Sequence, residues 1–223
     1  MNLKLLYALA LGDGYVYNKR DKRLKHRPSY AGIVFSHSLK QLPYLEFKRN
    51  ILLNFFDNCP SIKEFSNNGY PGVTLTKGDV VFKKIHAKLY PNNVKIISRD
   101  ILNMFDAECL AIWYMDDGGL GVKKRDGKIH AFDLILNTHT TTDQNQIMID
   151  YFKEVWDVQF TQVKNKGHYR LRCGTKEAKK FIQIVKPFIL PMFAYKIDPL
   201  ETRPNSNSVY NVDTSAQHPQ LRG

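Results

Sequence analysis

The sequence predicts an α+β fold made of two copies of one αββαββα unit, related by a pseudo-twofold axis. Two apolar runs, "LYALALGDGY" (6–15) and "LAIWYMDDGGL" (110–120), each lead into an acid and a glycine. Alternating strands and helical stretches follow each run in the same order. We therefore divide the chain into an N-terminal half, 1–100, and a C-terminal half, 101–200. Residues 201–223 are polar and aperiodic, and a flexible tail without a function is expected there.

The apolar runs open the two halves and are expected to be helices. Residues 3–11 and 110–115 leave no polar face, and a helix that is apolar all round is buried on all sides. Ala8 and Ala10 allow close approach of another backbone. If the two helices pack against each other at the pseudo-twofold axis, they form a central two-helix interface.

The later elements of each half also match in order. The offset between them falls from 104 to 101 and then to 96 residues, as expected if loops changed length after a duplication. Each half thus reads as helix, two strands, helix, two strands, helix. The matched segments are strands 32–38 and 133–139, helices 44–56 and 145–156, strands 73–76 and 169–172, and helices 83–91 and 179–187.

The charge of the chain is strongly positive. Lys and Arg number 33 against 21 Asp and Glu, which gives a net charge of +12 and a pI near 9.5. A clustered surplus of this size favours a polyanionic partner, nucleic acid first and an anionic membrane surface second, over a role in solubility alone. The longest apolar stretch, near 3–11, is too short for a membrane span and is followed by no signal-peptide cleavage pattern.

The cysteines and histidines do not predict a metal site. The cysteines are odd in number and widely spaced, with neither CxxC nor a histidine at zinc-ligand spacing, so reduced thiols in a reducing, intracellular compartment are expected. Three histidines lack a spacing that indicates metal ligands and are expected to be surface or core residues instead. These residues are Cys59, Cys109 and Cys173, and His37, His86 and His168.

Asp13 and Asp117 stand at matching places, each at the C-terminal end of an apolar run, where the helix dipole is already negative. Brought together, the two carboxylates would repel each other and lose hydration. Either one carboxyl stays protonated or a divalent cation binds, and a basic chain with a polyanionic partner favours a hard cation such as Mg²⁺ or Mn²⁺. Metal ions beside a polyanion hydrolyse phosphodiesters by activating water and stabilising the leaving oxygen. The alternative is that the two acids merely belong to Asp-Gly turns.

The nonapeptides "LYALALGDG" and "LAIWYMDDG" resemble the two motif copies of single-chain LAGLIDADG homing endonucleases. "LAIWYMDDGG" together with "LNTH" (136–139) is similar to the group encoded in introns of organellar ribosomal RNA genes, and the resemblance covers residues 3–197. It implies a monomeric, site-specific endonuclease that cuts both strands of a long, imperfectly palindromic DNA target, without membrane contact, in a mitochondrion or chloroplast if expressed there. An RNA maturase that aids splicing of its own intron, and a DNA-binding regulator that does not cut, are the alternatives.

The resemblance also implies site residues. The last acid of each motif would bind the catalytic divalent metals, with two backbone carbonyls as further ligands, and register with Asp13 selects Asp117 over Asp116. One lysine per half would lie near the scissile phosphates, where an ammonium polarises water or offsets transition-state charge. A plain solvated charge is the alternative for each lysine. The acids are Asp13 and Asp117, the carbonyls those of Gly12 and Asp116, and the lysines Lys95 and Lys196, from "NNVKI" (92–96) and "FAYKI" (193–197).

In this family one antiparallel sheet per half straddles the DNA. The alternation in "YRLRC" places Arg170 and Arg172 on one face, and the matched strand offers Thr74 and Thr76. Arginine reads guanine and asparagine reads adenine, whereas Ser and Thr select less, so the two half-sites are expected to differ. DNA contacts are expected from these faces, from the basic loops 19–27 and 123–128, and from a further pair of lysines. The residues are Arg20, Lys22, Arg23, Ser36, Ser38, Thr74, Thr76, Lys123, Lys124, Arg125, Asn137, His139, Lys164, Lys166, Arg170 and Arg172.

Overall fold

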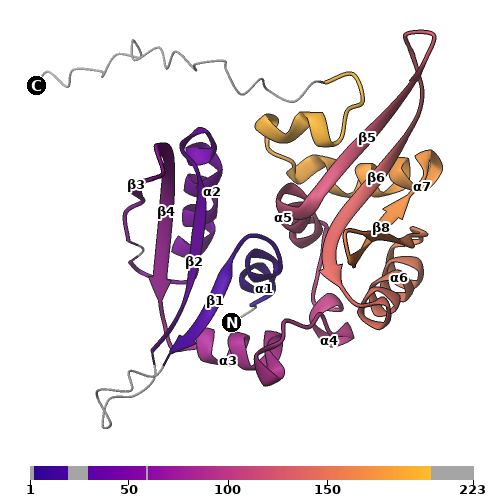
Figure 1. Cartoon of the computed structure of the whole chain (residues 1–223). Coiled ribbons are helices and arrows are strands. Elements are labelled where there is room, and N and C mark those ends of the chain that lie inside the picture. Colours follow the sequence, from indigo (N-terminus) through magenta and orange to yellow (C-terminus); the bar gives the residue numbers. More distant parts are fainter. Residues whose placement is uncertain (1–2, 20–29, 59, 202–223) are drawn as a thin grey trace, which may run out of the picture.

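The structure, a computed structural model, describes residues 3–19, 30–58 and 60–201. Its elements follow the predicted order in both halves, and Figure 1 shows one sheet on either side of a central helix pair. The predicted α+β fold of duplicated units is therefore confirmed. Cys59 and the expected contacts Arg20, Lys22 and Arg23 lie outside the described residues.

The N-terminal half forms one antiparallel sheet with the strand order β1-β2-β4-β3. Helices α2 and α3 pack on one face of this sheet. The elements are α1 (Lys4–Leu11), β1 (Tyr15–Lys19), β2 (Tyr30–Ser38), α2 (Leu42–Leu53), β3 (Lys63–Asn67), β4 (Tyr70–Gly78) and α3 (Val81–Leu89).

The C-terminal half repeats this arrangement with the strand order β5-β6-β8-β7, and α6 and α7 pack on one face of its sheet. A short helix, α4 (Arg99–Leu102), joins the halves, and a 3-10 segment, η4 (Pro191–Lys196), follows the last helix. The remaining elements are α5 (Ala107–Asp117), β5 (Gly118–Arg125), β6 (Lys128–Thr140), α6 (Thr142–Trp156), β7 (Thr161–Asn165), β8 (His168–Cys173) and α7 (Thr175–Val185).

The central helices are buried as their composition predicts. Leu6, Ala8 and Leu9 of α1 are inaccessible to solvent, and residues 109–115 of α5 are all buried. At their N-terminal ends the carboxylate of Asp106 accepts a hydrogen bond from the backbone N–H of Cys109 and pairs with Lys4 of α1. The two helices therefore share one core between the halves, and the predicted two-helix interface is present.

Alternation along the strands gives each sheet a buried face and an open face. In β2, Ile33 and Phe35 are buried against the helices, whereas Ser36 and Ser38 are exposed. Asp13 lines a groove with Ser36 and Ser38 of the first sheet, and Asp117 lines a recess with Asn137 of the second, so the helix ends and the two sheets together form the candidate site. In the part of the chain that the structure describes, none of the helices has the length and apolar character needed to cross a membrane.

One sequence expectation about a loop is wrong. The basic segment 123–128 belongs mostly to the β5–β6 hairpin, because Lys124 pairs with Ile129 and Arg125 pairs with Lys128 across the strands. The hairpin turn is reduced to Asp126 and Gly127, both of which have positive φ. The strand continues because backbone pairing to β6 is maintained after the sheet has left the core, and a polar composition does not prevent that pairing.

Candidate active site

The C-terminal ends of α1 and α5 approach each other closely. A Cβ on Gly12 would lie 2.0 Å from Oδ2 of Asp116, so the absence of a side chain at position 12 makes room for that carboxylate. The backbone N–H of Asp13 donates a hydrogen bond to the same oxygen at 2.9 Å. Since Asp117 directly follows Asp116, both motif acids stand at the junction of the two helix ends.

The two motif acids have raised pKa values in this setting. Burial, together with repulsion from Asp116, raises the pKa of Asp13 to about 6. Burial, followed by repulsion from Asp116 and from Asp13, raises the pKa of Asp117 to about 7. The indole N–H of Trp113 donates to Oδ2 of Asp117 at 3.1 Å and fixes this carboxylate. The acids therefore influence one another electrostatically, and a cation between them would relieve their repulsion.

The donor set suits a hard cation. Within the described residues no group of three or more His, Cys, Asp or Glu side chains gathers as a closed metal cage. Divalent ions here would be held by the carboxylates of Asp13 and Asp117, with remaining positions left to backbone carbonyls, water and substrate oxygens, which suits Mg²⁺. The carbonyl of Asp116, expected as a ligand, accepts a 3.4 Å hydrogen bond from Lys196.

The two lysines expected near the scissile phosphates, Lys95 and Lys196, occupy equivalent places in the two halves. Nζ of Lys95 donates to the carbonyl of Leu11 at 2.8 Å, and Nζ of Lys196 donates to the carbonyl of Met115 at 2.6 Å. Leu11 and Met115 hold the same position in the two motifs, so each lysine caps the C-terminal end of its own half's helix. Burial lowers the pKa of Lys95.

A recess of about 190 Å³ places Lys95 and Asp117 on one surface. Gly12 and Asn137 line it as well, and Nδ2 of Asn137 donates to the carbonyl of Asp117 at 3.0 Å. The recess therefore collects one lysine, one acid and one strand residue at the foot of the second sheet. The recess thus places a lysine and an acid that the sequence analysis selected on one surface.

Sequence reasoning missed a buried network beneath Asp13. Oδ1 of Asp116 accepts hydrogen bonds from the hydroxyl of Tyr44 at 2.6 Å and from Nζ of Lys48 at 2.8 Å. Lys48 Nζ also lies 3.3 Å from Nε2 of His37. The available signal was Lys48 itself, a lysine in line with the buried residues of α2.

His37 was expected to have a surface or core role, and it is a buried residue next to the site. Its Nδ1 lies 3.8 Å from Oδ2 of Asp13. Burial, followed by the nearby Lys48 ammonium, lowers the pKa of His37 to about 4. The ring is therefore neutral at neutral pH and contributes a hydrogen-bonding group rather than a charge.

The open face of the N-terminal sheet carries hydroxyls and aromatic rings. Ser36 Oγ lies 3.4 Å from Thr74 Oγ1, and Ser38 and Thr76 are exposed on the same face. A groove of about 580 Å³ extends over this face from Asp13. Its lining includes Ser36, Ser38, His37, Phe65, Asn67 and Tyr70.

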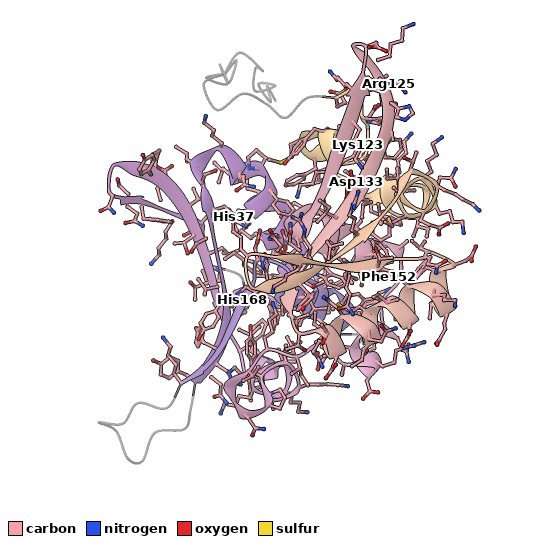
Figure 2. The ribbon with its side chains drawn as sticks, turned by 45° about the vertical axis from the view of Figure 1, so that its right-hand side comes forward. His37, Lys123, Arg125, Asp133, Phe152 and His168 are labelled. Carbon is pink, nitrogen blue, oxygen red and sulfur yellow. The ribbon has the colours of Figure 1, made fainter. Side chains whose placement is uncertain are left out.

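The open face of the C-terminal sheet carries guanidinium groups instead. Leu171 and Cys173 are buried, which leaves Arg170 and Arg172 on the open face, as the alternation predicts. Nε of Arg172 donates to Oδ2 of Asp133 at 2.5 Å. Figure 2 shows Lys123 and Arg125 toward the outer end of the β5–β6 hairpin, with Asp133 nearer the centre of the molecule. The other exposed residues expected to contact DNA in this half are Lys124, His139, Lys164 and Lys166.

Comparisons with known proteins agree with this fold. The family model described as the LAGLIDADG DNA endonuclease family matches residues 3–181. The structure of the homing endonuclease I-WcaI bound to its DNA recognition sequence has a TM-score of 0.68 and 26% sequence identity, covering 88% of this chain and 85% of that chain. The meganuclease I-SmaMI bound to uncleaveable DNA shares the fold at a TM-score of 0.55 and 14% identity, covering 85% of both chains.

Two curated relatives match most of the chain. A probable intron-encoded endonuclease of Wickerhamomyces canadensis is 27% identical over 193 residues, which cover 84% of this chain and 79% of that protein. The cytochrome b mRNA maturase bI2 of Debaryomyces hansenii is 24% identical over 209 residues, which cover 87% of this chain and 72% of that protein.

Proposed function

The chain belongs to the LAGLIDADG DNA endonuclease family, and we propose that it hydrolyses both strands of a long, imperfectly palindromic DNA site with divalent cations held at Asp13 and Asp117. The observation that carries this proposal is the junction of the two helix ends. There, two acids at matching motif positions are accompanied by two lysines that bind matching carbonyls, those of Leu11 and Met115.

In this proposal the acids bind metal and the lysines face the phosphates. When bound, Mg²⁺ or Mn²⁺ supplies a Lewis acid and lowers the pKa of water. Lys95 and Lys196 hold positive charge where negative charge grows on the phosphate during the reaction. Hydrogen bonds to the helix ends fix both ammonium groups before DNA binds. The two side chains therefore lose little conformational entropy when DNA binds.

The two sheets bind one half-site each, with residues 1–100 forming one half and 101–200 the other. A two-stranded antiparallel ribbon fits the major groove of B-DNA, and the open faces present Ser, Thr, Asn and Arg side chains that read base edges. Because one chain supplies both halves, the protein needs no second copy. Sedimentation should give the mass of a monomer, and an obligate dimer would contradict this.

The decisive experiment is a cleavage selection from a randomised DNA library with the purified chain and Mg²⁺. We expect recovery of one long site that is cut on both strands, and no cutting when EDTA removes the metal. The double variant Asp13→Asn/Asp117→Asn is the matched control, since it keeps the shape of both side chains and removes both charges. Equal cutting by this variant would disprove the assignment of the acids.

A maturase function is the second candidate, and the similarity to the maturase of D. hansenii favours it. Such a function requires binding to a folded intron RNA at sites that need not include the acids. The test is a gel-shift competition in which unlabelled target DNA challenges the complex with the intron RNA that surrounds the coding sequence. Specific RNA binding that survives the double acid variant would support the maturase role.

A further inference from the structure

Among the residues that the structure describes, a buried ion pair lies under Asp13, and none lies under Asp117. Nζ of Lys48 and Oδ1 of Asp116 are 2.8 Å apart, and neither side chain is exposed to solvent. The other oxygen of Asp116 accepts the backbone N–H of Asp13 at 2.9 Å. Tyr44 completes the group by donating its hydroxyl to Asp116. The pair thus joins α2, the end of α5 and the backbone of Asp13.

The opposite half has neither member of this pair. Helices α2 and α6 bury residues at the same positions with an offset of 100, and at that offset Lys48 corresponds to Met148, which is also fully buried. In the motif, Asp116 occupies the seventh position, where the other copy has Gly12. The pseudo-twofold symmetry is therefore broken by one cation and one anion at the centre of the molecule.

The cation of the pair acts on one acid, whereas the anion acts on both. Nζ of Lys48 lies 3.8 Å from Oδ2 of Asp13. The negative charge of Asp116 acts on Asp13 and on Asp117 alike. Lys95 favours the charged form of Asp117, and the matching Lys196 favours the charged form of Asp13, so these two lysines have matching roles. Lys48 is the additional positive charge on the side of Asp13.

We propose that the Lys48–Asp116 pair positions Asp13 and makes the two strand-cutting sites unequal, with the site at Asp13 the slower one. The proposal rests on the proposed function. An ammonium at 3.8 Å from the Asp13 carboxylate opposes a divalent cation at that carboxylate. Asp116 meanwhile holds the backbone of Asp13 in place, so the acid cannot move away from Lys48 without breaking a hydrogen bond. Lys48 and Asp116 are positioning residues, since they act through Asp13.

The test compares the wild type with the double variant Lys48→Met/Asp116→Ala. This variant introduces the methionine found at the matching position of α6 and removes both charges together, so no unpaired charge stays buried. A target duplex labelled separately on each strand gives the two cutting rates. In the wild type we expect a nicked intermediate and strand rates that differ by about fivefold, the size expected of one partly screened charge interaction. In the double variant both charges are gone, so the ratio of the two strand rates should fall to within about twofold.

A second readout does not depend on catalysis. Calorimetric titration of Ca²⁺ into the protein–DNA complex should show two classes of site with different affinities in the wild type, and the two affinities should become alike in the double variant. The single variants Lys48→Met and Asp116→Ala each leave a buried charge without its partner, so both should unfold at lower temperature than the double variant. The matched control is Arg99→Met/Glu154→Gln, which removes an exposed ion pair of 2.7 Å and should change neither the strand ratio nor Ca²⁺ binding.

The outcomes separate two failures. A wild-type protein that cuts neither strand under any divalent metal contradicts the proposed function itself. Equal strand rates in the wild type, or an unchanged bias in the double variant, contradict only the positioning role of Lys48 and Asp116. A bias that also disappears in the Arg99/Glu154 control contradicts that role too, because the effect would then come from charge removal anywhere.

Discussion

The two halves of the molecule agree in the lysine contacts at the helix ends and differ on the open faces of the sheets. In both halves a lysine binds the carbonyl at the same motif position, Leu11 in one and Met115 in the other. The open face of the first sheet carries Ser36 and Thr74, whereas that of the second carries Arg172 held by Asp133. This difference has a physical reason. A change on α1 or α5 disturbs the core of both halves, while each open face can change without affecting the other half.

The strongest test of the agreement is to remove each acid in turn. Asp13→Asn and Asp117→Asn should each reduce double-strand cutting by roughly a hundredfold to a thousandfold, since each variant removes an electrostatic contact with the reacting groups. DNA binding in Ca²⁺ should stay within about twofold, because the sheets are unchanged. Plasmid linearisation and gel shift measure the two quantities. If only one of the two variants loses activity, the acids are not equivalent ligands.

The lysines provide the next largest effect. Lys95→Met and Lys196→Met should each slow cutting by roughly tenfold to a hundredfold, mainly on one strand, since each ammonium stands beside one acid. Strand-resolved rates measure this. The exposed Lys164→Met is the control and should weaken binding without changing the strand preference. Equal slowing of both strands by Lys95→Met would show that the lysine only stabilises the fold.

Most of the fold could be predicted from the sequence because its signals are periodic and occur twice. The all-apolar character of α1 and α5 indicated burial on every side, and the alternation in 169–173 separated Arg170 and Arg172 from Leu171. The continuation of β5 through Arg125 was missed because backbone pairing, which composition does not report, decides where a hairpin turns.

The polar network beneath Asp13 was harder to predict. Register with Asp13 selected Asp117 over Asp116 as the metal-binding acid and gave Asp116 only a backbone role. Its side chain matters because Gly12 leaves space across the helix interface, a fact about the opposite chain segment. Lys48 reaches Asp116 from α2, which is 68 residues away in sequence. A pairing over that distance follows from tertiary packing and from no local pattern.

Gly12 gives a test of how tightly the halves are joined. Gly12→Ala should lower the free energy of unfolding by about 1–3 kcal/mol, because the added Cβ collides with the Asp116 carboxylate, which is itself held by Lys48. Denaturant unfolding measures this. Gly119→Ala is the matched control near the end of α5, where an added Cβ meets no atom within 4 Å, and it should be neutral or slightly stabilising. Equal effects of the two changes would mean that the helix ends are not in close contact.

The difference between the open faces predicts a local change in specificity. Arg172→Ala should relax discrimination at one base pair of one half-site, by about 1–3 kcal/mol. Asp133→Asn should act at the same base pair with a smaller effect, because it releases the guanidinium from a 2.5 Å hydrogen bond without removing it. Cleavage of single-base variants of the target measures both. A uniform loss over all sequences, with a smaller salt slope, would instead identify Arg172 as a phosphate contact.

The smallest expected effect is a difference in stability between variants of the two acids in the metal-free protein. The pKa of Asp117, about 7, is raised above its unfolded value of 3.8, so its contribution to stability is present below about pH 4 and is lost as the pH rises through 7. Asp117→Asn carries no charge at any pH, so in EDTA it should be more stable than the wild type by about 1 kcal/mol at pH 8, after allowance for screening, and equal to it near pH 4. Asp13→Asn should gain less, because the Asp13 side chain is 41% exposed and its pKa is raised only to about 6. Thermal unfolding in EDTA at the two pH values measures both gains, and a larger gain for Asp13→Asn would mean that the charge of Lys48 does not offset that of Asp13.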